Sequence, residues 1–370
     1  MGDRIRTLVR GPLDWEASYA AAIEHGVLAL VSRNLLSVCP DDVPEEFRKR
    51  MKADLLRIAQ RNLFLTAEML RLSRMLHAEG LFAVPYKGPL LAAEAYGDFG
   101  LRQFVDLDFA VLQRDIFRSQ AILMREGYRA SFGEVTREEG AKPTLSEYQY
   151  IRAEGNVVVE LQTETTLRYF PSPLDFEEMG RRLEPISLAG AQAFTFSAED
   201  TLLLLSVHGA KHFWERLLWI ADVAELLQAC SGLNWEKAFA RGEELKAGRM
   251  LRLALYVAEE MLGAPLPEEV KKKIQADSAV RKLGRRIRAR FSLNAEAPLT
   301  VFERFHFRVM SRDNLRQGVS YALRLATSPA NPDRADMPLP GWLSGARRFL
   351  RPLLLTKRYG VRRSKTGQGQ

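Results

Sequence analysis

The first part of the chain has the hydrophobic pattern of helices. Between Asp41 and Gly80, apolar residues recur every three or four positions, so they share one face of a helix. The residues of this face are Phe47, Met51, Leu55, Ile58, Leu65, Met69, Leu72 and Leu76. Gly80 favours a helix end. Residues 1–78 are therefore predicted to form a helical N-terminal segment whose long helix packs on the part that follows.

Residues 79–196 alternate between strand and helix patterns. β-rich runs occupy 81–86, 102–111, 147–152 and 156–162, and the last two flank a turn, which predicts a hairpin. Residues 115–126 have the spacing of a helix, and the polar stretch 131–147 is interpreted as a loop. This order predicts a mixed sheet with helices on one side, the core of an α+β fold.

From Ser197 onwards the pattern is helical again. One helix is predicted from Ser197 to about residue 229, and further helices follow to about residue 325. Residues 197–327 are thus expected to form a helical C-terminal domain. Residues 328–370 read as a proline-rich linker and a basic tail.

The strand at 102–111 carries two carboxylates. Asp106 and Asp108 are two positions apart, so they point to the same side, while Val105, Leu107 and Phe109 are expected to face a core. Burying two like charges is costly, and a bound divalent cation relieves the repulsion. Carboxylate oxygens suit Mg²⁺ or Mn²⁺. An isolated Asp-x-Asp can also be a surface turn.

Three further residues extend this candidate site. Glu160 lies on the later strand, where it shares a face with Val158 and Gln162. Lys87 and Gly88 sit between a strand and a helix, where glycine permits close approach and a helix start offers N–H groups to phosphate. Lys87 could instead cap the strand and pair with an acid, Asp98 or Glu94.

These motifs together resemble a known family. Lys87-Gly88, Tyr96-Gly97-Asp98, Arg102, Asp106-Leu107-Asp108, Glu160-Leu161, the run His208-Gly209-Ala210-Lys211-His212-Phe213-Trp214, and Asp222 resemble the bacterial uncharacterised nucleotidyltransferases, within the superfamily of the DNA polymerase β type. Two features depart from the pattern. Gly88 is followed by proline and lies eighteen residues before Asp106, and Gln162 stands where the family often has histidine.

The resemblance implies a metal-dependent enzyme that transfers a nucleoside monophosphate from an NTP, with ATP as the default, and releases pyrophosphate. Asp106, Asp108 and Glu160 would be the catalytic metal ligands for Mg²⁺ or Mn²⁺. Lys87, Gly88 and Arg102 would bind phosphate, although Arg102 could equally hold the strand by a salt bridge. The acceptor, whether a small molecule, a peptide or a protein, is not identified.

A polar face is predicted on the helix after Ser197. At 100° per residue, one third of its circumference carries His208, Lys211, His212, Glu215, Trp219 and Asp222. His208, Lys211 and His212 are expected to face the nucleotide or acceptor across a cleft; a solvated polar face is the alternative. A zinc-protease motif is excluded because Gly209 stands where glutamate is required.

Charge and composition narrow the class of protein. The chain is 46% apolar and 27% charged, and it has two cysteines, which fits a soluble cytoplasmic protein without a disulfide framework. No membrane span or secretory signal is expected. The net charge is +8, and residues 341–370 contain eight basic residues and no acid. That tail leaves contact with nucleic acid or an anionic membrane open, beside a solvated terminus.

A non-catalytic nucleotide-binding or regulatory protein on the same fold is the remaining alternative. The sequence makes no prediction about oligomeric state.

Overall fold

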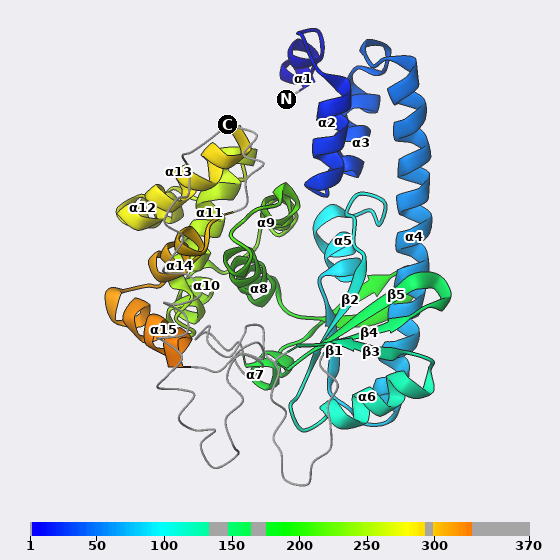
Figure 1. Cartoon of the computed structure of the whole chain (residues 1–370), viewed down its shortest axis with the longest axis vertical. Helices are drawn as coiled ribbons and strands as arrows, with labels where there is room; N and C mark the ends of the chain where they lie inside the picture. Colours follow the sequence, from blue (N-terminus) through cyan, green and yellow to red (C-terminus); the bar gives the residue numbers. More distant parts are fainter. Residues whose placement is uncertain (1, 133–146, 164–174, 293–298, 328–370) are drawn as a thin grey trace, which may run out of the picture.

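A computed structural model describes residues 2–132, 147–163, 175–292 and 299–327. The chain forms a sheet-containing half, flanked by the N-terminal helices, and a half made of helices α8 to α15 (Figure 1). The combination of a mixed sheet with helices before and after it confirms the predicted α+β fold class.

The main sheet has five strands in the order β1-β2-β5-β4-β3. β2 and β5 run parallel, and all other neighbours are antiparallel. The strands are β1 (Ala83–Tyr86), β2 (Asp106–Val111), β3 (Arg129–Phe132), β4 (Glu147–Arg152) and β5 (Val157–Gln162). The predicted hairpin is therefore present as β4 and β5, joined through the short helix η2 (Glu154–Asn156).

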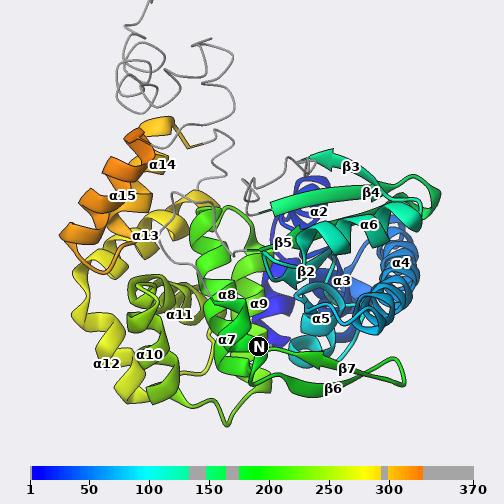
Figure 2. The ribbon, with the colours of Figure 1, turned by 90° about the horizontal axis from the view of Figure 1, so that it is seen from below.

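The two faces of this sheet have different roles. Leu107 and Phe109 of β2 point into a core shared with α4 (Glu45–Ala78) and α6 (Ile116–Arg125). The apolar face predicted for α4 supplies Leu65, Met69, Leu72 and Leu76 to this core. Figure 2 shows α4 and α6 on the side of the sheet away from the helical half. The opposite face, which carries the carboxylates, is turned towards α8.

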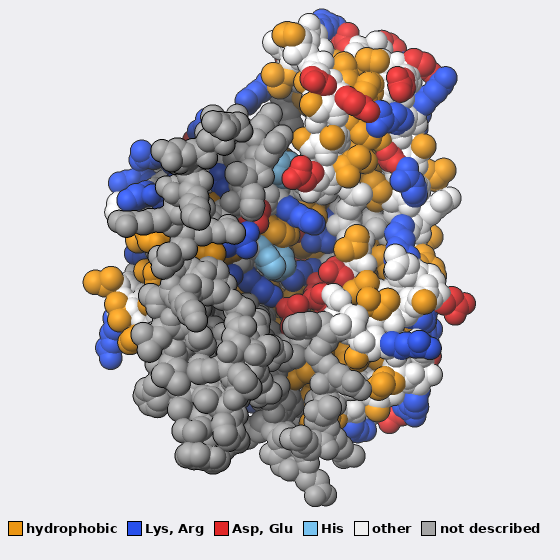
Figure 3. Space-filling model, in the orientation of Figure 1, with side chains coloured by type: hydrophobic (Ala, Val, Ile, Leu, Met, Phe, Trp, Pro, Cys, Tyr) orange, Lys and Arg blue, Asp and Glu red, His pale blue; other side chains and the backbone are white. Residues whose placement is uncertain are grey.

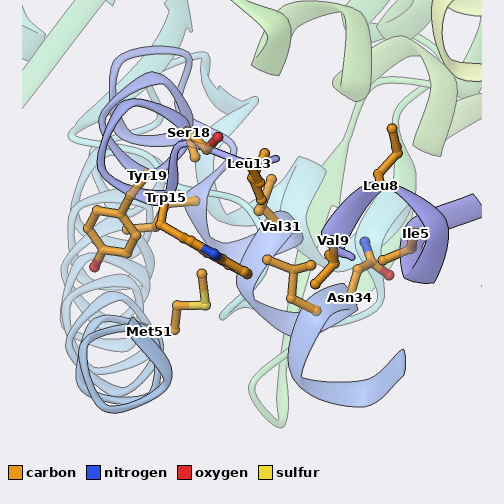
Figure 4. Close-up of a pocket in the computed structure, with 13 residues that line it drawn as sticks. Ile5, Leu8, Val9, Leu13, Trp15, Ser18, Tyr19, Val31, Asn34 and Met51 are labelled. Atoms are coloured by element: carbon orange, nitrogen blue, oxygen red, sulfur yellow. The ribbon is translucent and has the colours of Figure 1, made fainter. Parts of the chain in front are cut away.

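Three shorter helices cover the first part of α4. They are α1 (Gly2–Val9), α2 (Trp15–Glu24) and α3 (Leu28–Val38), followed by the short helix η1 (Pro40–Asp42). Their core includes Tyr19, Leu28 and Met51. Between them is a cavity of about 380 Å³, into which Val9, Trp15 and Met51 project from different helices (Figure 4). The N-terminal helices and α4 therefore surround an apolar pocket.

The helical half is built around α11. This helix contacts α8, α9, α10, α12 and α13. The bounds are α8 (Ala198–Lys211), α9 (Leu217–Ala229), α10 (Trp235–Glu244), α11 (Gly248–Leu262), α12 (Glu268–Ala276), α13 (Ser278–Ser292), α14 (Val301–Met310) and α15 (Leu315–Thr327). The hydrophobic core of the helical half extends into the sheet-containing half. It includes Val84 of β1, Leu91 of α5 (Gly88–Tyr96) and Phe176 of α7 (Phe176–Gly180).

Several local predictions were wrong. The single helix predicted over 197–229 breaks after Lys211, because Phe213 and Trp214 adopt left-handed backbone angles, with φ of 61° and 54°. Part of the predicted loop 131–147 belongs to strands β3 and β4, and the hairpin of β6 (Glu184–Leu188) and β7 (Ala191–Thr195) was not predicted. Val105 precedes β2 and is 72% exposed instead of facing a core.

Within the described parts of the chain, no helix combines the length and apolar character needed to cross a bilayer. The predicted linker and basic tail at 328–370 lie outside the described residues.

Candidate active site

The carboxylates of neighbouring strands converge on one face of the sheet. Asp108 of β2 is directly opposite Glu160 of the parallel strand β5, so their side chains point the same way. Gln162 joins them, because its Nε2 donates to Asp108 Oδ1 at 2.9 Å and to Glu160 Oε2 at 3.2 Å. Asp106 is on the same face, partly exposed at the start of β2. The structure thus places these three predicted residues on one face of the sheet.

Burial and mutual repulsion disfavour the ionised forms of these carboxyl groups. Burial raises the pKa of Asp108 to about 7; Lys87 opposes that rise, while Asp106 and Glu160 add to it. Burial also raises the pKa of Glu160, and the charges of Glu147 and Asp106 add to the rise. The site would therefore gain stability from additional positive charge.

The orientation of the Gln162 amide is fixed from behind. The Tyr86 hydroxyl donates a hydrogen bond to Gln162 Oε1, which leaves the NH₂ group directed at the two carboxylates. Burial raises the pKa of Tyr86 well above its ordinary value, so this hydroxyl keeps its proton. Gln162 therefore links the carboxylates of β2 and β5 through hydrogen bonds of fixed direction.

Two polar residues of β4 were missed by the sequence analysis. Gln149 donates to Glu160 Oε1 at 3.1 Å, and Glu147 forms an ion pair with Lys211 of α8 at 2.9 Å. Both lie on the carboxylate face, since Gln149 is opposite Glu160 and Glu147 opposite Gln162. The alternation of β4 together with the hairpin register would have placed them there.

Lys87 lies where β1 passes into α5. Its Nζ is 3.7 Å from Asp108 Oδ2 and 3.1 Å from His208 Nδ1. Among the described residues, Lys87 therefore pairs with Asp108 and not with Asp98 or Glu94. Lys87 holds a left-handed φ of 57°, and Gly88, at the start of α5, lies beside the first residue of β2. The Lys-Gly turn thus sits at the carboxylates despite its distance along the chain.

Arg102 makes a different contact from the one predicted first. Its Nε and Nη2 donate to the two carboxylate oxygens of Asp222 at 2.7 and 2.9 Å, and Tyr96 OH donates to Asp222 Oδ1 at 2.8 Å. All three side chains are buried. Arg102 therefore forms a salt bridge, which was the alternative to phosphate binding. Its partner is Asp222 and not one of the acids next to it in the sequence. Phosphate binding by Arg102 stays a prediction.

Two histidines and a tryptophan form an aromatic group opposite the carboxylates. The rings of His208 and His212 are 4.7 Å apart, and Trp219 lies 5.4 and 5.2 Å from them. Burial and nearby lysines lower the pKa of His212 to about 3 and that of His208 well below its ordinary value, so both rings are neutral. His208 Nδ1 can therefore accept a hydrogen bond from Lys87.

The histidine and lysine side chains thus meet the carboxylates across a hollow. Figure 3 shows basic and histidine side chains next to acidic ones in the depression between the two halves. His208, His212 and Trp219 lie together as predicted, although the chain breaks between α8 and α9. Asp222, which was predicted on the same face, is instead buried against Arg102.

Whether the site fits a divalent cation depends on donors and on spacing. Asp106, Asp108 and Glu160 supply hard oxygen donors on one face, and the charges of Asp106 and Glu160 add to the rise that burial causes in the pKa of Asp108. Among the described residues, however, no three acidic, histidine or cysteine side chains are arranged to hold a metal ion. Gln162 and Lys87 already contact the oxygens of Asp108 to which a cation would bind. The chemistry of these oxygen donors fits a divalent cation, and their side chains would have to rearrange to bind one together.

Comparison with known proteins places the chain in a family. No curated protein matches the chain. A crystal structure of an antigenic nucleotidyltransferase-like protein from Paracoccidioides brasiliensis is 13% identical, with 58% of this chain and 93% of that chain covered, but its TM-score of 0.33 is too low to support a conclusion. Residues 11–263 match the family described as "Uncharacterised nucleotidyltransferase". That match spans most of the chain and includes every residue of the site, so the protein belongs to this nucleotidyltransferase family.

Proposed function

We propose that the protein is a metal-dependent nucleotidyltransferase, related to the DNA polymerase β type, which moves a nucleoside monophosphate from an NTP to an acceptor and releases pyrophosphate. The observation that carries this proposal is the convergence of Asp108 and Glu160, from two parallel strands, on the single amide of Gln162. Family membership supports the reaction class.

Asp106, Asp108 and Glu160 would hold the cation. Mg²⁺ or Mn²⁺ bound there would neutralise the triphosphate and favour deprotonation of the acceptor hydroxyl. Lys87 would exchange its contact with Asp108 for one with the triphosphate, because an ammonium group beside a cation site is placed to stabilise the charge that develops on phosphate oxygens.

The aromatic group on α8 and α9 would bind the nucleotide or the acceptor. Neutral His208 and His212 can donate or accept hydrogen bonds, and Trp219 offers a partly exposed ring. Lys211 is held towards the sheet by Glu147 and would meet phosphate there. ATP is the first nucleotide to test.

The binding step has a direct test. Titration of Mn²⁺ into the wild type, followed by electron paramagnetic resonance, should give saturable binding that is lost in Asp106→Ala/Asp108→Ala. The matched control is Asp41→Ala/Asp42→Ala, an acidic pair in η1 outside the site, which should bind as the wild type does. Equal binding by the wild type and the site variant would contradict the proposal.

The transfer step is tested with labelled NTPs. Incubation with cell extract should transfer label to an acceptor with the wild type, and Asp106→Asn or Asp108→Asn should reduce transfer to background with the fold retained, because a repulsive pair is relieved. Loss of stability together with retained transfer would contradict the assigned roles.

A non-catalytic nucleotide-binding role is the second candidate. Two observations favour it: the described parts of the chain contain no three-ligand cluster that could hold a metal ion, and Lys87 already pairs with Asp108. Nucleotide binding without Mn²⁺ binding or label transfer would select this candidate.

A further inference from the structure

The outermost helix of the helical half exposes a stripe of aliphatic side chains. Leu315, Val319 and Leu323 follow each other at intervals of four along α15 and are 79, 49 and 61% exposed. The inward side of the same helix is formed by fully buried Tyr321. Of the fourteen large hydrophobic residues exposed in the described chain, six belong to α14 and α15. Such clustering, unlike single exposed leucines, indicates an interaction surface.

Beside the aliphatic stripe, the surface of α15 carries two arginines. Arg316, Ser320 and Arg324 each follow one position after a member of the stripe, about 100° further round the helix. With Lys246, Asn314 and Gln317 they line a cavity of about 440 Å³ that has three cations and no acid in its lining. In Figure 3, hydrophobic and basic side chains lie side by side over α15, at the left edge. We call the stripe and the three cations the α15 surface.

This combination matches the interface of an anionic membrane. An amphipathic helix lying in the plane of a bilayer buries aliphatic side chains among acyl chains while arginines meet lipid phosphates. RNA would use the cations, but its bases stack on aromatic rings and gain little from an aliphatic stripe. The chain beyond α15 carries charge of the same sign, since residues 341–370 have eight basic residues and no acid.

We propose that the α15 surface binds anionic lipid membranes, with Leu315, Val319 and Leu323 inserted at the headgroup boundary and a lipid phosphate in the basic cavity. This inference does not depend on nucleotidyl transfer.

The test is sedimentation of the full chain with vesicles. Phosphatidylcholine vesicles containing phosphatidylglycerol should bind the protein, and pure phosphatidylcholine vesicles should not. Arg316→Gln/Arg324→Gln should weaken binding roughly 30-fold, because each basic residue near an anionic surface contributes roughly fivefold. Leu315→Ser/Val319→Ser/Leu323→Ser should also weaken it. The matched control, Leu56→Ser/Leu63→Ser on α4, removes leucines of similar exposure and should leave binding unchanged.

Several outcomes would overturn the proposal. Unchanged binding by the α15 variants would do so, as would failure of the wild type to bind either vesicle. Loss of binding only when the basic residues of 341–370 are changed to glutamine would assign the membrane contact to the tail. Binding of single-stranded RNA or of inorganic phosphate through Arg316 and Arg324 without vesicle binding, or self-association abolished by the leucine variants, would identify another occupant.

Discussion

At the scale of single residues, the site depends on one amide group. Gln162 gives its two N–H bonds to carboxylates on different strands and has its oxygen held by Tyr86. Alanine here would leave Asp108 and Glu160 without a shared donor. Gln162 is therefore a positioning residue for the two proposed metal ligands, and loss of a residue that orients metal ligands typically lowers metal affinity.

We therefore expect Gln162→Ala to lower Mn²⁺ affinity by about 10- to 100-fold. Tyr86→Phe should have a smaller effect in the same direction, because the amide loses its fixed orientation. Calorimetric titration with Mn²⁺ measures both. Gln120→Ala is the matched control, since Gln120 is also buried but lies on α6, where its amide contacts Met124.

Equal Mn²⁺ affinity in the wild type and Gln162→Ala would refute the positioning role. Absence of Mn²⁺ binding in the wild type would instead refute the metal site itself, so the two failures are distinguishable.

At the scale of elements, the connection between α8 and α9 is closely packed. Gly209 of α8 lies under the indole of Trp214, and a Cβ at that position would be 2.5 Å from the ring. Trp214 is itself fully buried and left-handed at the backbone. Glycine is thus required for a close approach that turns the chain and brings Trp219 to the histidines.

Gly209→Ala should destabilise the protein by about 1–3 kcal/mol, because the buried indole must move. Thermal unfolding measures the loss. Gly232→Ala is a suitable control, since no atom lies within 4 Å of its added Cβ and no left-handed backbone angle opposes it. A melting temperature of Gly209→Ala equal to that of the control would show that the turn accommodates the methyl group.

The sequence predicted those elements whose pattern is local. The apolar face of α4 and the hairpin of β4 and β5 follow from periodicity and turn residues, and the common face of Asp106 and Asp108 follows from strand alternation. The break at Phe213 could not be predicted, because two left-handed aromatic residues are stabilised by tertiary packing. The pairing of Arg102 with Asp222 likewise depends on a contact between residues far apart in sequence.

At the scale of the whole molecule, the buried carboxylate of Glu68 connects α4 to the sheet through hydrogen bonds. Glu68 accepts hydrogen bonds from Arg71, from Tyr128 and from Arg152 of β4. Burial raises the pKa of Glu68, but these hydrogen bonds and the arginine charges outweigh it and lower the pKa to about 2. The ionised carboxylate is therefore bound more strongly in the folded state than the protonated one.

A lowered pKa stabilises the fold above the ordinary pKa of glutamate, and that stabilisation is lost as the pH falls towards about 2. Glu68→Gln should therefore cost on the order of 2–3 kcal/mol at neutral pH. The difference from the wild type should shrink from about pH 4.5 downwards and vanish near pH 2. Denaturant unfolding across this range measures it, and Glu46→Gln, exposed at the start of α4, should show no such trend. A difference independent of pH would contradict the ionic contribution.

The buried contact of Arg102 and Tyr96 with Asp222 also limits how the protein can be divided. Each half contributes one charge of this buried pair, and an isolated fragment would expose the hydrophobic surface between the halves together with a charge that has lost this partner. We expect separately expressed fragments cut between β7 and α8 to be insoluble alone and to recover structure when co-expressed. A different helical scaffold joined to the sheet half would have to present an aspartate to Arg102 at the position of Asp222.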